Sequence, residues 1–204
     1  MSKDLEILES FYSPRLKSFG AGSAASVGFD DDERRKLRWK ILVEGTSLSE
    51  VKKILDIGCG LAHMSEFLNG NGFHGSYHGF EALESFVTEG KKQYPNCDIR
   101  KHNYINDRVS ETFDCIVSNG LFTLNTPNHW ENLSIYLSRC FEMLDNNGVL
   151  AFNLFPDDVN FTDPQFAYFN IGKVIDLISK HTRSYIVRRD YLQFDVTFYC
   201  YKRG

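Results

Sequence analysis

The fold is decided by one stretch of the chain, Lys52-Lys53-Ile54-Leu55-Asp56-Ile57-Gly58-Cys59-Gly60-Leu61-Ala62-His63-Met64. Its first half is a short, nearly continuous apolar run, typical of a parallel strand that is covered on both faces. Gly58 and Gly60 follow this run, and the missing Cβ atoms allow a sharp turn and the close approach of a ligand to the backbone. The stretch therefore predicts a buried strand that ends in a glycine turn.

A helix is expected directly after the turn, because Met64, Phe67 and Leu68 recur at helical spacing. Strand, turn and helix together place a ligand at the carboxyl end of a strand, beside a helix N-terminus. A phosphate-binding P-loop is excluded, because no Lys followed by Ser or Thr stands after the second glycine. A dinucleotide fingerprint is disfavoured, because His63 occupies the position of its third glycine.

The composition of the 204 residues, 42% hydrophobic and 25% charged, is that of a globular protein with a full core. A net charge of −4 makes nucleic acid an unlikely partner. No apolar run of about 18 residues is present, so no membrane span is expected. The first residues lack a signal-peptide pattern, and the five dispersed cysteines indicate reduced thiols rather than metal ligands. We therefore expect a cytoplasmic protein without a bound metal.

Residues 1–48 are expected to form an N-terminal helical cap or lid, and residues 49–204 a ligand-binding domain. Apolar residues at helical spacing predict a first helix that Pro14 breaks. A second helix is expected to begin near Asp30, where acidic residues precede basic ones. The cap is expected either to pack as a helical pair on the sheet or to close its Gly20–Ser26 loop over a ligand.

From residue 51 onward, strand and helix patterns alternate, which predicts an α/β sheet with parallel pairing. Further strands are expected at 75–81, 97–101, 113–118 and 149–155, and helices at 82–93, 129–144 and 171–180. A turn is expected at 146–148. The segments 184–190 and 195–201 are expected to form an antiparallel hairpin at the end of the sheet.

Glu81 ends the second expected strand and is a candidate ligand-binding residue. An acid about 20 residues beyond a glycine turn can accept hydrogen bonds from both ribose hydroxyls of an adenosine-containing ligand. Its two oxygens match a vicinal diol. The alternative is a surface acid that favours the start of the next helix, and the two roles do not exclude each other.

The stretch from Asp56 to Ala62 resembles motif I, D-x-G-x-G-x-G, of the class I S-adenosylmethionine-dependent methyltransferases, with Ala62 in place of the last glycine. The likeness covers nearly the whole chain, which is similar to a group of small bacterial methyltransferases of undefined substrate. The other segments that carry it are 27–29, 38–39, 113–122, 148–153 and 187–199. The resemblance implies a Rossmann-like, seven-stranded, mostly parallel sheet whose last strand is antiparallel.

The resemblance also implies the cofactor S-adenosyl-L-methionine, with S-adenosyl-L-homocysteine as product. The expected cofactor-binding residues are Asp56, Gly58, Cys59, Gly60, Glu81, Ala82, Asn103, Tyr104, Ser118 and Arg38. In this set, Asn103 would accept from the adenine amino group and Tyr104 would stack on the ring, while Arg38 would pair with a carboxylate. His102-Asn103 replaces the common Gly-Asp pair, and a turn-forming role for Asn103 is equally compatible with the sequence.

The activity implied is methyl transfer to an O or N atom of a small metabolite. Positioning supplies most of such catalysis, and a base is needed only if the acceptor holds its proton. His129 and Tyr191 are the candidate catalytic residues, with His63 and Tyr168 as further candidates for a base or an orienting group; a structural role is the alternative for each. No D/N-P-P-Y sequence follows the fourth expected strand, which disfavours a nucleobase or amide nitrogen as acceptor.

Two other functions compete with methyl transfer. One is a non-catalytic adenosine-ligand-binding or regulatory subunit with the same fold. The other is a nicotinamide-dependent oxidoreductase, against which His63 argues. Either a monomer or a homodimer is compatible with the sequence.

Overall fold

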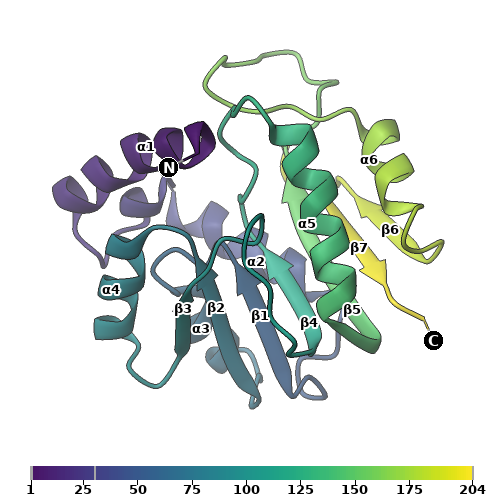
Figure 1. Ribbon diagram of the computed structural model, residues 1–204, viewed down its shortest axis with the longest axis horizontal. Coiled ribbons are helices and arrows are strands. Elements are labelled where there is room, and N and C mark those ends of the chain that lie inside the picture. The colour runs from purple at the N-terminus through teal and green to yellow at the C-terminus, as the bar shows by residue number, and fades with distance from the viewer. Residues whose placement is uncertain (1, 30, 204) are drawn as a thin grey trace.

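The computed structural model describes residues 2–29 and 31–203, which form one seven-stranded sheet in the order β3-β2-β1-β4-β5-β7-β6 (Figure 1). Strands β1 to β5 pair in parallel, and β7 is antiparallel to both β5 and β6. The expected mostly parallel sheet with an antiparallel last strand is thus confirmed. The strands are β1 (Lys53–Ile57), β2 (Ser76–Glu81), β3 (Asp98–Lys101), β4 (Phe113–Ser118), β5 (Leu144–Leu154), β6 (Tyr185–Arg188) and β7 (Val196–Tyr201).

Helices cover both faces of the sheet, with α5 and α6 in front of it and α2 and α3 behind it in Figure 1. Strand β1 has apolar side chains on both faces, and each face needs a covering layer. Ile54 packs in one apolar cluster with Trp39 and Leu42, whereas Leu55 packs in the other with Leu133. The helices are α1 (Lys3–Phe19), α2 (Asp32–Val43), α3 (Met64–Gly70), α4 (Glu84–Gln93), α5 (His129–Met143) and α6 (Ile171–Ile178), with a 3₁₀ helix η1 (Ala24–Val27). Among the residues described, no helix is both long and apolar enough to cross a membrane.

The expectation that Pro14 breaks the first helix is wrong, because α1 continues to Phe19 and ends at Gly20. Proline removes one backbone donor inside the helix and normally kinks or ends it. Here the apolar face on both sides of Pro14 packs in a third cluster, where Leu8, before Pro14, and Leu16, after it, contact residues that include Phe86 of α4. Tertiary packing therefore outweighs the local cost of the proline.

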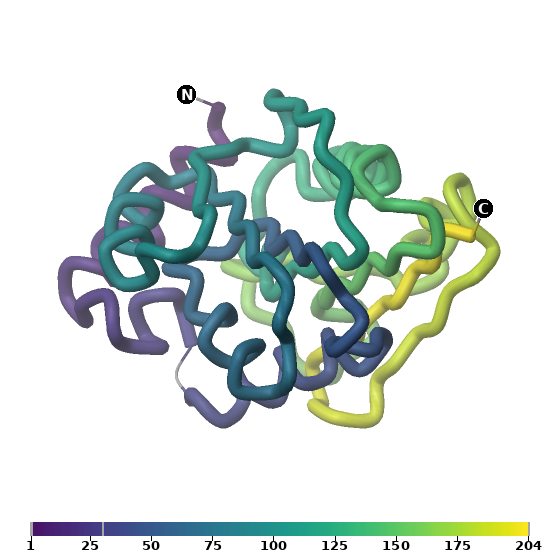
Figure 2. Tube along the Cα trace, turned by 90° about the horizontal axis from the view of Figure 1, so that it is seen from below, coloured from purple at the N-terminus to yellow at the C-terminus, as the bar shows by residue number. Residues whose placement is uncertain are grey.

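Segment 1–48 contributes to two different parts of the molecule. Helix α2 packs in the core cluster behind the sheet, whereas α1 and η1 pack on α4 at the edge of the third cluster. The helix expected to begin near Asp30 starts at Asp32, with Asp31 as its N-cap, and Asp30 lies outside the described residues. In Figure 2 the purple start of this segment lies on one side of the molecule, whereas α2 reaches the C-terminal hairpin, where Tyr199 Oη of β7 donates to the Ile41 carbonyl of α2.

Two other boundaries differ from the expectation. The turn expected at 146–148 lies within β5, where the pairing register with β4 shifts between Phe113 and Cys115 and Asn147 has a φ of 67°. The helix expected from residue 82 begins at Glu84, with Leu83 as N-cap. Neither difference moves the carboxyl ends of β1 and β2, where the glycine turn and Glu81 lie.

Candidate functional site

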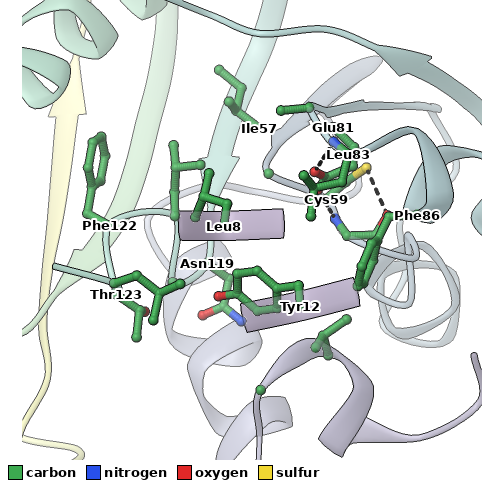
Figure 3. Close-up of a pocket in the computed structure, with 18 of the residues that line it drawn as sticks. Leu8, Tyr12, Ile57, Cys59, Glu81, Leu83, Phe86, Asn119, Phe122 and Thr123 are labelled. Atoms are coloured by element: carbon green, nitrogen blue, oxygen red, sulfur yellow. Dashed lines mark hydrogen bonds between the residues drawn. The ribbon is translucent and has the colours of Figure 1, made fainter. Parts of the chain in front are cut away.

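A cavity of about 390 Å³ lies at the carboxyl ends of the parallel strands, a size typical of small-molecule sites. The residues that directly follow β1, β3, β4 and β5 line it: Gly58, His102, Asn119 and Phe155. Helix α1 supplies another wall, and Figure 3 shows its Leu8 and Tyr12 together with Asn119, Cys59 and Glu81 around the cavity. Among the described residues, no group of three or more His, Cys, Asp or Glu side chains comes together as for a metal ion.

The glycine turn forms the floor of this cavity. Gly58 and Gly60 have φ of 75° and 57°, in the left-handed region that favours glycine. A Cβ on Gly58 would lie 2.7 Å from Leu121 Cδ1, so no larger residue fits without movement. Ala62, in the place of the last motif glycine, also keeps a left-handed φ of 62° and is fully buried.

Glu81 joins the end of β2 to the glycine turn. Its Oε2 accepts the N–H of Gly60 at 3.0 Å, and its Oε1 accepts the N–H of Leu83 at 2.9 Å. Burial raises the pKa of Glu81, while the backbone donors oppose this shift. Each oxygen keeps a further lone pair, so the carboxylate can still accept from the two hydroxyls of a diol.

Asp56, next to the turn, is a second buried carboxylate that lines the cavity. Burial raises the pKa of Asp56 to about 7, although Oδ2 accepts a hydrogen bond from Tyr77 Oη at 2.8 Å. Burial also raises the pKa of the Cys59 thiol well above its ordinary value. Cys59 is therefore a neutral thiol, and it lines the cavity with Ala82.

His102 is a cavity residue that the sequence reasoning did not select. Its ring stacks on Phe80 with centroids 4.1 Å apart, and the residue is only 9% exposed. Neither ring nitrogen has a hydrogen-bond partner among the described residues. Burial lowers the pKa of His102, so its ring is neutral and offers one donor and one acceptor. The position of His102 directly after the third expected strand could have identified it as a residue of the site from the sequence.

The next two residues, Asn103 and Tyr104, also line the cavity. Asn103 Oδ1 accepts the N–H of Ile105 at 3.0 Å, so the side chain does form the local turn that was its alternative role. The Tyr104 ring packs edge-on against Tyr136, with centroids 5.7 Å apart. Burial raises the pKa of Tyr104, so its hydroxyl stays protonated.

Three candidates lie away from the cavity lining. The Ser118 hydroxyl is buried 2.8 Å from Tyr136 Oη, because the alternation of β4 turns this side chain toward α5. Tyr191 lies beyond β6, 2.7 Å from Thr197 Oγ1, and burial raises the pKa of its hydroxyl. Tyr168 accepts the N–H of Asp163. The structure thus brings neither tyrosine to the site as a base.

Arg38 lines the cavity, but its guanidinium already has a partner. Its Nε and Nη2 donate to Asp195 Oδ2 at 3.1 and 2.9 Å, which joins α2 to the start of β7. Both side chains are largely buried, and burial raises the pKa of Asp195 against the opposing effect of Arg38. A ligand carboxylate would therefore share Arg38 with Asp195.

The two histidine candidates, His129 and His63, differ in how many of their ring nitrogens are already hydrogen-bonded. His129 lines the cavity at the start of α5, and its Nδ1 donates to the Thr126 carbonyl at 2.8 Å, which leaves Nε2 as an acceptor of the neutral ring. His63 uses both nitrogens: Nε2 donates to Ala21 O and Nδ1 accepts from Arg35, each at 2.8 Å. Of this pair, only His129 has a ring nitrogen that takes no part in these hydrogen bonds.

Comparison with known proteins agrees with this geometry. Residues 55–152 match the family model described as a methyltransferase domain. A putative methyltransferase, 235L of Invertebrate iridescent virus 6, is 25% identical over 79 residues. This match spans 39% of the present chain and 30% of the viral protein.

Solved structures share the fold at low sequence identity. The complex of DhpI with S-adenosylhomocysteine has a TM-score of 0.72 at 12% identity, over 98% of this chain and 97% of that one. The N-methyltransferase NodS from Bradyrhizobium japonicum, also with S-adenosylhomocysteine, has a TM-score of 0.66 at 13% identity, over 95% and 99% of the two chains. Residues 55–152 therefore match a methyltransferase domain, and the chain as a whole has the fold of these two solved proteins.

Proposed function

We propose that the chain binds S-adenosylmethionine in this cavity and transfers its methyl group to an O or N atom of a small metabolite. The observation that carries the proposal is the position of Glu81, whose carboxylate is bonded to the N–H of Gly60. Acid and glycine turn thereby form a single cradle at the carboxyl ends of β1 and β2. A ribose diol on Glu81 would place the rest of the cofactor along the turn.

Two further features support the fit of this cofactor. Gly58 and Gly60 line the cavity without side chains, so a ligand can approach the backbone of the turn. His102 holds two buried ring nitrogens without partners among the described residues, and one of them would match a polar atom of adenine. These features support the proposal, because His102 has an unpaired ring nitrogen for a nucleobase and Glu81 has remaining lone pairs for a ribose.

The bound cofactor supplies an electrophilic methyl group on a sulfonium, and the chain's residues position it. Asp56 and Glu81 place two carboxyl groups near the turn, and their ionised forms would favour a cationic ligand. Leu8 and Tyr12 of α1 line the cavity and would shield a bound ligand from water. His129 Nε2 takes the proton when the acceptor brings one.

The first test is calorimetric titration with S-adenosylhomocysteine, with NAD and ATP run alongside. Selective binding of S-adenosylhomocysteine is expected, and Glu81→Gln should weaken it about tenfold or more, because a hydrogen bond to a charged group contributes about 1.5–3 kcal/mol. Glu84→Gln is the matched control, because Glu84 is exposed and forms a surface ion pair with Lys101. A folded protein that does not bind S-adenosylhomocysteine would refute the proposal, and equal affinity of the Glu81 variant would remove Glu81 from the ribose site.

The remaining expectations belong to the same proposal. The net charge of −4 supports a small molecule rather than a nucleic acid as acceptor. The dispersed cysteines support a cytoplasmic location. A monomer or a homodimer is the proposed state in solution.

A further inference from the structure

Asp4 is a buried acid that has no role in the proposed binding of the cofactor. It lies in the first turn of α1, is only 6% exposed and lines the cavity. Its Oδ2 accepts from Asn132 Nδ2 at 2.7 Å and lies 3.4 Å from Asn128 Nδ2. Its Oδ1 is buried and has no hydrogen-bond partner among the described residues.

A role in tethering α1 to α5 accounts for only one of the two carboxylate oxygens. The amides of Asn128 and Asn132 both reach Oδ2, and a neutral Asn at position 4 could accept from them in the same way. Buried carboxylates are normally paired with a cation, because desolvation without a partner is costly. Within the described residues, none of the ion pairs includes Asp4, whereas Asp195 in the same cavity is paired with Arg38.

The surroundings of Asp4 indicate which kind of cation would pair with its free oxygen. Leu5 and Leu8 of α1 and Phe122 after β4 give this part of the cavity apolar walls. His129 directly follows Asn128 in the chain and also lines the cavity, with Nε2 as its acceptor nitrogen. A carboxylate with a free oxygen, apolar walls and a nearby base together suit a ligand with an ammonium group on an apolar body.

We propose that Asp4 binds the ammonium group of the methyl acceptor, so that the acceptor is a primary or secondary amine with an apolar body. This inference rests on the proposed function and names the acceptor class for the same cavity. The ammonium loses one proton to His129 Nε2, and the freed nitrogen lone pair forms the N–CH₃ bond. The S–CH₃ bond breaks, its electron pair stays on sulfur as a neutral thioether, and the methylated nitrogen carries the positive charge.

The test uses two probes of the same size, 2-phenylethylamine and 2-phenylethanol, titrated into the protein with and without saturating S-adenosylhomocysteine. The amine should bind about tenfold or more tightly than the alcohol, because only the amine forms a charge-assisted hydrogen bond. Asp4→Asn should abolish this preference and leave the affinity for S-adenosylhomocysteine within about twofold. Glu6→Gln is the control, an exposed acid on the same helix that should keep the preference.

Three results would overturn the inference: equal affinity of amine and alcohol, retention of the preference in Asp4→Asn, or a large loss of S-adenosylhomocysteine affinity in that variant. The last would place Asp4 in the cofactor site. Circular dichroism shows whether Asp4→Asn folds, and if it does not, the comparison of the two probes on the unmodified protein decides alone. Absence of S-adenosylhomocysteine binding refutes the proposed function separately, because the amine titration of the cofactor-free protein still reports on Asp4.

Discussion

Gly58 shows how one residue links the fold to the site. It must turn the chain with a left-handed backbone, and it must leave room for Leu121 from the loop after β4. The glycine pattern made the turn predictable. The contact with Leu121, which lies more than 60 residues further along the chain, was not predictable, because no local pattern records which side chain will pack there.

Gly58→Ala should therefore harm both stability and binding. A left-handed backbone costs a residue with a Cβ about 1–2 kcal/mol, and the clash at Leu121 adds to this. We expect a lower free energy of unfolding in urea and a weaker affinity for S-adenosylhomocysteine. Gly70→Ala, at the end of α3 with open space around it, should be neutral or stabilising by up to about 1 kcal/mol. Equal affinities of Gly58→Ala and the unmodified protein would contradict the role of the turn.

At the scale of elements, His63 connects three segments. It begins the turn into α3, donates to Ala21 in the loop between α1 and η1, and accepts from Arg35 of α2. The same Arg35 also pairs with Asp32. In the sequence His63 was the residue that replaces the third glycine of a dinucleotide fingerprint and a candidate base or orienting group, whereas in the structure it holds the N-terminal segment against the site.

This contact should make the stability of the protein depend on pH. Burial first, and then the charge of Arg35, lower the pKa of His63, whereas its bond to Ala21 and the charge of Asp32 act in the opposite direction. Because the folded-state pKa lies below the unfolded value of about 6.5, the stabilisation is complete above that pH and is lost as the pH falls below it. Protonation would put a second donor opposite Arg35.

His63→Gln tests this, because the amide can replace both hydrogen bonds without titrating. The unmodified protein should lose more free energy of unfolding than the variant between about pH 7.5 and pH 5.5. His74→Ala is the control, since His74 is exposed and should leave the pH dependence unchanged. Burial also lowers the pKa of His102 and His181, and both therefore contribute to the pH dependence of stability. The contribution of His63 is the difference in this pH dependence between His63→Gln and the unmodified protein. Identical pH profiles for His63→Gln and the unmodified protein would exclude this contact as the source.

At the scale of the whole molecule, the cavity is assembled from segments that span almost the whole length of the chain. Leu8 of α1, the turn after β1, the end of β2, the residues directly after β3 to β5 and Asp195 before β7 all line it. A ligand that contacts the folded cavity and not the unfolded chain stabilises every element together. Ligand binding should therefore raise the stability of the N-terminal segment as much as that of the sheet.

S-adenosylhomocysteine at about one hundred times its dissociation constant should stabilise the fold by about 2.7 kcal/mol. For a chain of this size that corresponds to a rise in Tm of about 5–10 °C. Differential scanning calorimetry measures the rise, and NAD at the same concentration should give none. A rise of the same size with NAD would favour the oxidoreductase hypothesis over methyl transfer.

The sequence by itself determined the strand–turn–helix around Gly58, the alternation that follows it and the acid at Glu81, because these features depend on local periodicity and backbone sterics. The resemblance added the strand order, which periodicity does not contain. Only the tertiary structure decided that α1 continues through Pro14, that Arg38 is held by Asp195, and that Ser118 and Tyr191 lie outside the cavity. It also decided the environments of His102 and Asp4. These depend on contacts between residues far apart in the chain, and burial at such contacts outweighs local preference.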